Sequence, residues 1–282
     1  MKNLLLFLAL AFLLSFAGGC AFLQMKKDSH ITVASFNIRV PIDKGDYTWK
    51  NRLPRIRKVV EQNKLDIFGI QEGLKFQIED MIAGTNYGYT GVGRNDFQSS
   101  GEYSAILYDK TKFDLLEFGT FGLSEKPDVP GVKSWGSAFP RIATWGLFRV
   151  RQTGKKFLFY NTHLDHISNL ARVNGIHLIM DHVNKRKEVS LPVILTGDFN
   201  ARPDSSVYKT ATQYLKDAAK ISVTKPLGPN GTYHGFKGKV LIYIDYIFVS
   251  NHVRVKSFKV DDTRIDGKYP SDHDPVVAEL FL

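Results

Sequence analysis

Apolar residues fall in short runs along most of this chain, and a few longer segments repeat them every three or four residues. The runs predict buried β-strands at 31–38, 67–70, 193–199 and 240–250. Further strands are expected at 87–92, 103–108, 113–118, 141–149, 156–162, 253–260 and 275–281. The segments with helical periodicity predict helices at 49–63, 74–82, 168–187 and 205–215.

The order of these elements predicts the fold class. Some strands follow one another in hairpin-like succession, whereas others are separated by helices. This mixture predicts an α/β sandwich with mixed sheets. From His30 to Leu282 the composition shows no break and no short-period repeat, so we expect a single domain over 30–282.

The periodicity also assigns faces to two helices. In the helix at 168–187, Leu170 and His177 lie on the side expected to pack against the core. The helix at 49–63 carries a basic face, which is either a solvated surface or a grip for a polyanion; its members are Lys50, Arg52, Arg55, Arg57 and Lys58. Three other histidines are expected at the surface: His166, His182 and His252.

Acidic residues stand at the ends of several predicted strands. Glu72 follows the apolar run at 67–70, Asp198 follows 193–195, and Asp245 follows 240–242. Asp272 and His273 directly precede the last strand. A carboxylate at the tip of a buried strand is costly unless it binds a metal, a partner charge or a substrate. We therefore expect one polar site at the ends of a sheet, with a structural salt-bridge network as the alternative.

The first residues have the pattern of an export signal. Lys2 precedes an apolar run of about 13 residues, which is too short to span a bilayer, and small residues lead to Cys20. Residues 1–19 are thus expected to be a lipoprotein signal peptide, with lipidation at Cys20 and a tether over 20–29. The alternative is a plain signal peptide with a chance cysteine. Cys20 is the only cysteine, so no disulfide is expected.

The formal net charge of +10 favours anionic partners such as nucleic acid, phosphorylated substrates or acidic lipid headgroups, although a lysine-rich soluble surface accounts for it equally well. Long loops are expected at 96–101, 122–140 and 228–238. Loops of this kind in compact domains are often functional, and packing over the sheet edge is the alternative for 122–140.

The motifs form an ordered set. They are Asn37, Gln71-Glu72, Asn161-Thr162-His163, Gly197-Asp198-Phe199-Asn200, Ile244-Asp245-Tyr246 and Ser271-Asp272-His273. With this set the chain resembles the endonuclease/exonuclease/phosphatase superfamily, which includes enzymes like deoxyribonuclease I, over nearly all of His30 to Leu282. The segments 123–125, 140–145 and 161–166 look most like a bacterial, deadenylase-like branch. The resemblance implies a four-layer α/β sandwich, two mixed β-sheets packed face to face with helices outside.

The resemblance also implies a metal site. Glu72 would be the principal ligand, with Asn37 and Asp272 nearby. A site of oxygen ligands suits Mg²⁺, or Mn²⁺, better than zinc. Some members place a further acidic ligand two positions after the equivalent of Asn37, where this chain has Arg39. That departure favours a single metal.

Further residues would carry the hydrolysis in such an enzyme. Asp198 would orient and deprotonate the attacking water, and Asn200 would steady the phosphoryl group. His273 would hydrogen-bond a phosphoryl oxygen or act as a base, held in place by Asp245. Two more residues would contact phosphate oxygens: His163 and Arg141. Two roles stay open for three further residues, either contact with the phosphate or ordinary helix capping and loop hydrogen bonds: Asp165, Arg172 and His234.

These features predict a Mg²⁺-dependent phosphoesterase, exported to the bacterial cell envelope and anchored to the membrane through Cys20. A nuclease or phosphodiesterase is the leading substrate class, on the basic charge and the deadenylase-like motifs. The alternatives are a phosphatase of small sugar or inositol phosphates, a phospholipid headgroup phosphodiesterase, and a catalytically silent surface binding protein. The absence of a hydrophobic hairpin with paired tryptophans disfavours a membrane-lipid substrate. No protein partner is predicted.

Overall fold

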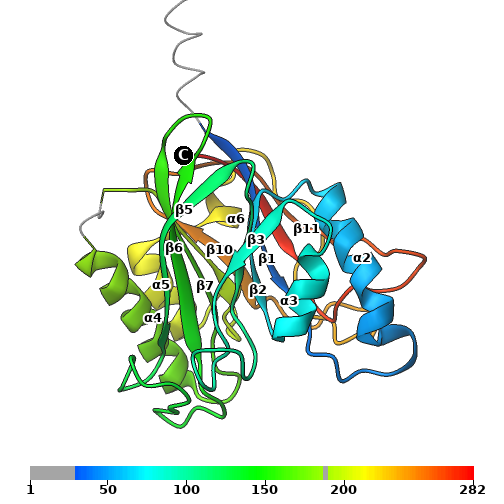
Figure 1. Ribbon diagram of the computed structural model, residues 1–282, viewed down its shortest axis with the longest axis horizontal. Coiled ribbons are helices and arrows are strands. Elements are labelled where there is room, and N and C mark those ends of the chain that lie inside the picture. The colour runs from blue at the N-terminus through cyan, green and yellow to red at the C-terminus, as the bar shows by residue number, and fades with distance from the viewer. Residues whose placement is uncertain (1–28, 187–189) are drawn as a thin grey trace, which may run out of the picture.

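The computed structural model describes residues 29–186 and 190–282, which form two six-stranded mixed sheets (Figure 1). The first sheet has the order β11 (Arg254–Val260), β12 (Val276–Phe281), β1 (His30–Asn37), β2 (Ile67–Gln71), β4 (Ile106–Asp109), β3 (Tyr87–Thr90). The second has the order β5 (Phe113–Gly122), β6 (Ile142–Val150), β7 (Lys156–His163), β8 (Val193–Asp198), β10 (Asp245–Val249), β9 (Lys216–Asp217). In each sheet one central pair is parallel, β1 with β2 and β7 with β8.

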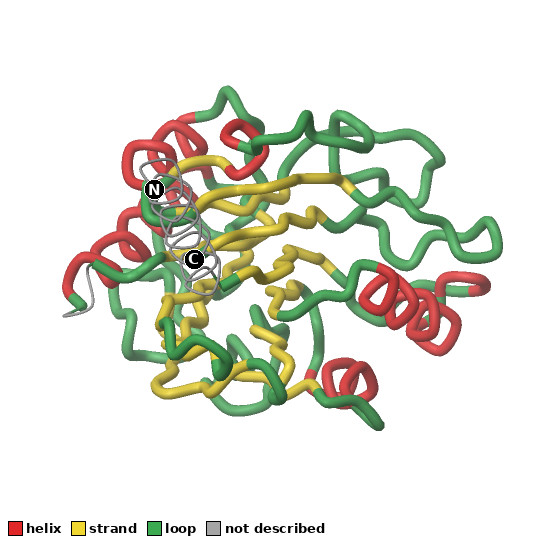
Figure 2. Tube along the Cα trace, turned by 90° about the horizontal axis from the view of Figure 1, so that it is seen from above, coloured by secondary structure: helices red, strands yellow, loops and turns green. Residues whose placement is uncertain are grey.

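Helices cover the outer face of each sheet, as the two views in Figures 1 and 2 show. Helices α2 (Trp49–Gln62) and α3 (Lys75–Ile82) pack on the first sheet through a hydrophobic cluster that includes Ile56 and Ile78. Helices α4 (Asn169–Lys185) and α5 (Ser206–Tyr214) pack on the second through a cluster that includes Ile176 and Val207. Two short helices, η1 (Gly45–Tyr47) and α6 (Ala218–Ile221), lie in connections. The predicted four-layer sandwich is confirmed.

The inner faces of the two sheets meet in a continuous apolar core. Val33 and Ile67 from the first sheet belong to the same buried cluster as Phe159, Ile194 and Ile247 from the second. Successive side chains of a strand point to opposite faces, so in these strands one set fills the space between the sheets and the other meets the helices. This explains why the central strands read as unbroken apolar runs: both of their faces are buried.

One predicted strand is wrong. The run Val240–Leu241–Ile242 is not a buried strand: Leu241 is exposed, and the segment makes backbone hydrogen bonds with Thr232 and Tyr233 in the preceding loop. The strand β10 begins at Asp245 itself, antiparallel to β8. Asp245 therefore stands at the start of a strand, not at the end of one, yet it reaches the same edge of the sheet because β10 runs in the opposite direction.

Four side chains lie in environments that differ from those predicted from the sequence pattern of their helices. Leu170 and His177 are exposed on α4, because the helix presents Ile176 and Ile179 to the core. His182 is half-buried, stacked on Phe121. Arg52 is fully buried and donates hydrogen bonds to the backbone carbonyls of four residues before α2, namely Ile38, Arg39, Val40 and Tyr47, so it is neither solvated nor available to a polyanion.

Cys20, the segment 1–28 and Lys187, where one helix was predicted to end, lie outside the described residues. Among the residues that the structure describes, no helix is long and apolar enough to cross a membrane.

Candidate active site

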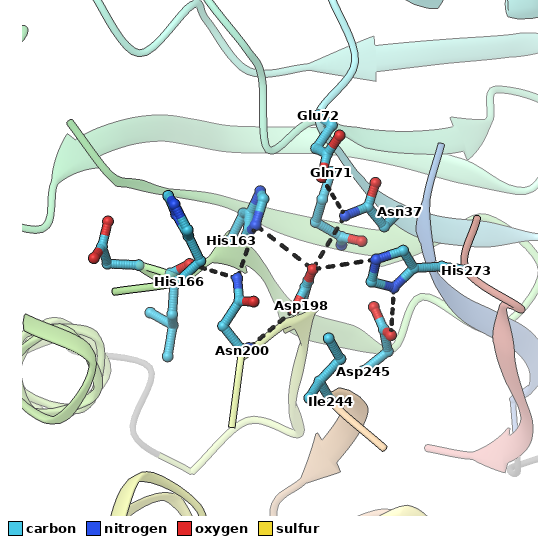
Figure 3. A network of polar contacts seen from close by, with 12 residues as sticks. Asn37, Gln71, Glu72, His163, His166, Asp198, Asn200, Ile244, Asp245 and His273 are labelled. Carbon is cyan, nitrogen blue, oxygen red and sulfur yellow. Dashed lines mark hydrogen bonds and ion pairs between the residues drawn. The ribbon is translucent and has the colours of Figure 1, made fainter. Parts of the chain in front are cut away.

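The polar residues predicted at strand ends meet at one end of the sandwich. Because β7 and β8 are parallel, His163 and Asp198 end their strands in register, and Asp245 at the start of β10 pairs with Asp198. Asn37 at the end of β1 pairs with Gln71 at the end of β2. Figure 3 shows the side chains from both sheets pointing toward one another around Asp198. The two sheets therefore contribute to a single site.

Asp245 and His273 form a buried hydrogen-bonded pair. His273 Nδ1 lies 2.8 Å from Asp245 Oδ2, and the hydroxyl of Thr232 donates to the same oxygen at 2.5 Å. Burial alone lowers the pKa of His273, but the carboxylate of Asp245 outweighs it and raises the pKa to about 10. His273 is thus held as an imidazolium at neutral pH, with Nδ1 fixed on Asp245 and Nε2 facing the site.

Asp198 lies at the centre of the site. Its Oδ1 accepts the backbone N–H of Asn200 at 2.9 Å, and its Oδ2 accepts from Asn37 Nδ2 at 3.1 Å. The Nε2 atoms of His163 and His273 lie 3.5 and 3.8 Å from Oδ2. Burial, followed by the nearby charge of Asp245, raises the pKa of Asp198. A carboxyl group with a raised pKa is suited to accept a proton near neutral pH.

Glu72 provides carboxylate oxygens at the end of β2, while Asn37 at the end of β1 turns its amide nitrogen toward the site and its Oδ1 accepts from the N–H of Arg39 at 3.0 Å. Glu72 has a left-handed backbone (φ 63°), which turns the chain sharply after β2 and directs its carboxylate into the cavity. The carboxylate accepts hydrogen bonds from Asn37 Nδ2 at 3.0 Å and from the N–H of Val40 at 3.1 Å. A cavity-lining carboxylate beside a second one, Asp198, with no thiolate among the ligands, fits a hard divalent cation.

A second group of side chains has metal-ligand spacing. One atom each of Asp198, Asp245 and His273 lies within 4.8 Å of the others. However, the facing atoms of Asp245 and His273 already share a hydrogen bond. Asp245 is already engaged there by His273 and Thr232, whereas the carboxylate of Glu72 lines the cavity, so we consider Glu72 the better ligand.

Asp272 is less suited to hold a metal. It is buried, and burial raises its pKa. Its carboxylate lies 3.5 Å from the guanidinium of Arg39, which also contacts Asp43 at 3.4 Å. The neighbouring hydroxyl of Ser271 donates to the carbonyl of Asn37 at 2.7 Å, which fastens the loop to β1. Asp272 thus lines the cavity as the ion-pair partner of Arg39.

His163, Asn200 and Arg141 line the opposite wall. Asn200 Nδ2 donates to His163 Nε2 at 3.1 Å and to the carbonyl of Leu164 at 3.0 Å. Burial, reinforced by the positive charge of Arg141, lowers the pKa of His163 well below its usual value, so the ring is neutral. Arg141 lies 3.4 Å from Asp165 and 3.0 Å from His166. Asp165 also accepts three backbone N–H groups, which identifies it as a loop-fixing residue.

A buried polar network between the sheets supports these residues. Asn161 donates to the carbonyls of Ile70 and Ala105 at 2.7 and 2.9 Å, and its Oδ1 accepts from Gln71 at 2.7 Å and Thr196 at 3.0 Å. All hydrogen-bonding capacity of its amide nitrogen is used, as a buried amide requires. The network ties β2 to β7 and β8 one residue behind the catalytic edge.

The cavity contains residues that the sequence did not single out. Its volume is about 400 Å³, and besides the residues above and Ile244 of the motif at 244–246 it is lined by Arg94, Glu102, Phe139 and Tyr233. Arg94 and Glu102 flank the predicted loop at 96–101, and Phe139 lies in the predicted loop at 122–140. In the sequence these residues are distinguished only by lying in or beside long loops, and that position does not predict where in the structure a loop lies.

The site and the fold agree with comparisons to known proteins. The profile of the Endonuclease/Exonuclease/phosphatase family matches residues 34–273. A mannosyl-6-phosphatase of Bacteroides thetaiotaomicron is 39% identical, with a TM-score of 0.82 over 89% of this chain and 99% of that chain. An endonuclease/exonuclease/phosphatase family protein of the same organism is 38% identical, with a TM-score of 0.84 over 90% of this chain and 98% of that one.

A curated relative is more distant. Nocturnin of Drosophila melanogaster is 28% identical over 282 residues, which is 83% of this chain and 42% of nocturnin. The chain thus spans about two fifths of the length of this relative. The resemblance that the motifs indicated is confirmed.

Proposed function

The chain belongs to the Endonuclease/Exonuclease/phosphatase family, whose members are metal-dependent hydrolases acting on phosphate esters, and from that premise we propose that it is a Mg²⁺-dependent phosphatase of small phosphorylated sugars. The observation that carries the proposal is the shape of the site: a cavity of about 400 Å³ walled by side chains of both sheets and of the loops. A volume in this range suits a small ligand that is largely enclosed. The similarity to a mannosyl-6-phosphatase supports the same substrate class.

The residues would divide the chemistry as follows. A divalent cation held by Glu72, with Asn37 beside it, would neutralise charge on the phosphoryl oxygens. Asp198 orients a water molecule and accepts its proton as the water oxygen attacks phosphorus and the ester P–O bond breaks; the sugar oxygen leaves as the alcohol, taking a proton from solvent water. His273, protonated and fixed by Asp245, donates from Nε2 to a phosphoryl oxygen.

The opposite wall completes the phosphate site. Asn200 Nδ2 gives its two N–H groups to His163 Nε2 and to the carbonyl of Leu164, so Asn200 positions the ring of His163. The neutral His163 carries its proton on Nδ1, and Arg141 contributes a fixed positive charge. His163 and Arg141 act on the developing charge without needing to reorganise, since their positions are fixed by the hydrogen bonds described above.

The test compares substrates on one protein preparation. Residues 21–282 with Mg²⁺ should release phosphate from mannose 6-phosphate and from p-nitrophenyl phosphate. His273→Ala should lower turnover by about 100- to 10,000-fold, and Asp198→Asn should abolish it. Cleavage of bis-p-nitrophenyl phosphate or single-stranded nucleic acid, without release from monoesters, would overturn the phosphatase assignment.

A nuclease or phosphodiesterase remains the second candidate. The net charge of +10 and the similarity to nocturnin favour it. Activity on bis-p-nitrophenyl phosphate and on single-stranded nucleic acid in the same assay distinguishes it from the phosphatase.

We also propose that the enzyme is exported and acylated at Cys20, on the pattern of residues 1–20 alone. Mass spectrometry of the protein purified from bacterial membranes should find a lipid on Cys20, and Cys20→Ser should move the protein to the soluble fraction. An unmodified Cys20 in membrane-extracted protein would contradict this proposal.

A further inference from the structure

The cavity continues past the phosphate site into a corner built by two loops. Arg94 and Glu102 bound this corner, and Phe139 stands at its rim. Arg94 Nη1 binds Glu102 Oε2 at 2.7 Å. The same oxygen lies 3.9 Å from His163 Nδ1, so the corner adjoins the phosphate site directly.

Buried polar atoms face this corner without a hydrogen-bond partner. Arg94 is 8% exposed and Arg141 is 5% exposed. Within the described residues, Arg94 Nε, Arg141 Nη1 and His163 Nδ1 have no hydrogen-bond partner. The three residues also line a small adjoining cavity together with Glu102. That small cavity measures about 10 Å³, room for about one water molecule, so a hydrogen-bond acceptor there would satisfy these donors, and a larger ligand would lie in the main cavity beside it.

Phe139 offers a flat apolar face at the same corner. Its ring is 47% exposed, although large apolar side chains are usually covered. The guanidinium of Arg94 lies 4.8 Å and that of Arg141 5.9 Å from the ring centroid, and His166 stacks on it at 5.7 Å. The ring is therefore held from several sides while part of it remains open to a ligand.

A purely structural role does not account for the Arg94–Glu102 pair. The loop between them is already closed by backbone hydrogen bonds, from Arg94 N to the Glu102 carbonyl and from Asn95 N to the Ser100 carbonyl, each at 3.1 Å. A buried ion pair contributes little net stability, because the cost of removing both charges from water offsets their attraction. The loop could keep its shape without placing these charges beside the phosphate site.

We propose that Arg94, Glu102 and Phe139 form a subsite for the neutral, polyhydroxylated ring of the substrate and select sugar monophosphates over other phosphate monoesters. This inference rests on the proposed phosphatase function. Ring hydroxyls donate to the Glu102 carboxylate and accept from the Arg94 guanidinium, while the apolar face of the ring packs on Phe139. The charges of Arg94 and Glu102 cancel each other, and the remaining positive charge of Arg141 lies on the side of the phosphate site.

The substitution Glu102→Gln tests the subsite. It should lower kcat/KM for mannose 6-phosphate by about 10- to 100-fold, mainly through KM, since a hydrogen bond to a charged acceptor is lost. For p-nitrophenyl phosphate, which has no hydroxyls, kcat/KM should stay within about 3-fold. Phe139→Leu, which leaves the ion pair intact, should show the same selectivity to a smaller degree. Glu125→Gln, at an exposed acidic residue outside the cavity, is the matched control.

The outcomes separate the two proposals. Equal losses on both substrates in either variant, or no loss on either, would overturn the subsite and leave the phosphatase assignment standing. If the wild-type protein releases no phosphate from sugar monophosphates but cleaves diesters, the phosphatase assignment falls and the subsite falls with it. A greater loss on mononucleotides than on mannose 6-phosphate in Glu102→Gln would assign the corner to a nucleoside and overturn the sugar subsite.

Discussion

The polar network between the sheets can be tested at Gly69, in the middle of β2. A Cβ atom at this position would lie 2.3 Å from Asn161 Oδ1, 2.3 Å from Thr196 Oγ1 and 2.4 Å from Asn161 Cγ. These separations are about 1 Å too short for contact, so in Gly69→Ala the amide of Asn161 must move. Asn161 joins four hydrogen bonds in the buried interior.

The expected cost follows from those contacts. Overpacking in a well-packed core costs about 1–3 kcal/mol, and each buried polar group left unsatisfied adds about 1–3 kcal/mol. With one or two groups left unsatisfied, Gly69→Ala should lower the free energy of unfolding by about 2–9 kcal/mol. For a domain of this size that is a fall in Tm of roughly 4 °C or more.

Thermal unfolding followed by circular dichroism measures this change. Gly88→Ala in β3 is the control, because its Cβ would meet only the flexible side chain of Lys110 and the ring of Tyr108, at 3.2 Å or more. A Tm for Gly69→Ala within about 2 °C of both the control and the wild type would refute the reasoning, since it would mean that Asn161 is not held in place by its four bonds.

Three further predictions concern single side chains. Asp245→Asn removes the negative charge that raises the pKa of His273. In the wild type kcat/KM is expected to fall near pH 10, and in the variant this fall should move down by at least about one pH unit. A fall at the same pH in both proteins would contradict the pairing of Asp245 with His273. The stability that this raised pKa contributes should be full below the unfolded value of about 6.5 and lost as pH rises through about 10, which denaturant unfolding at several pH values measures. Glu72→Gln should weaken Mg²⁺ binding in calorimetry at least about 10-fold without lowering Tm, and unchanged affinity would exclude Glu72 as a ligand. Arg52→Met, which removes the donor to four carbonyls before α2, should cost about 3–5 kcal/mol, whereas Lys50→Met on the exposed face should cost less than about 0.5 kcal/mol.

The fold was predictable because the central strands are buried on both faces. Runs such as Val193–Leu195 have no polar alternation, and only a sheet covered on each side accommodates them. The segment 240–242 misled the prediction because three apolar residues in a row do not distinguish a strand from a loop packed beside one. Arg52 misled it for another reason: a fully buried arginine is rare, and nothing in a basic helical face shows that one member turns inward to bind carbonyls.

The core of the site was also predictable, since costly charges at strand ends are visible in the sequence. Glu72, Asp198, Asp245 and His273 do lie together, and Figure 3 shows them around one centre. The contribution of the loops to the site was not predictable. Arg94 and Glu102 belong to no periodic pattern in the sequence, and their position depends on how the loop closes against Phe139. The residues proposed to select the substrate are thus the ones that the sequence pattern left undistinguished.

The charges around Glu72 support the proposal of a single divalent cation. Glu72, Asp198 and Asp272 bring three carboxyl groups to one wall of the cavity, and such a group would repel itself without compensation. Burial and the neighbouring charges relieve part of this by raising the pKa of Asp198 and of Asp272. Arg39 relieves another part, because its guanidinium lies 3.5 Å from Asp272 in a backbone conformation (φ 61°) that turns it into the site. Where some family members are expected to place another acidic ligand, this chain places a fixed cation, and a second metal would have to compete with it.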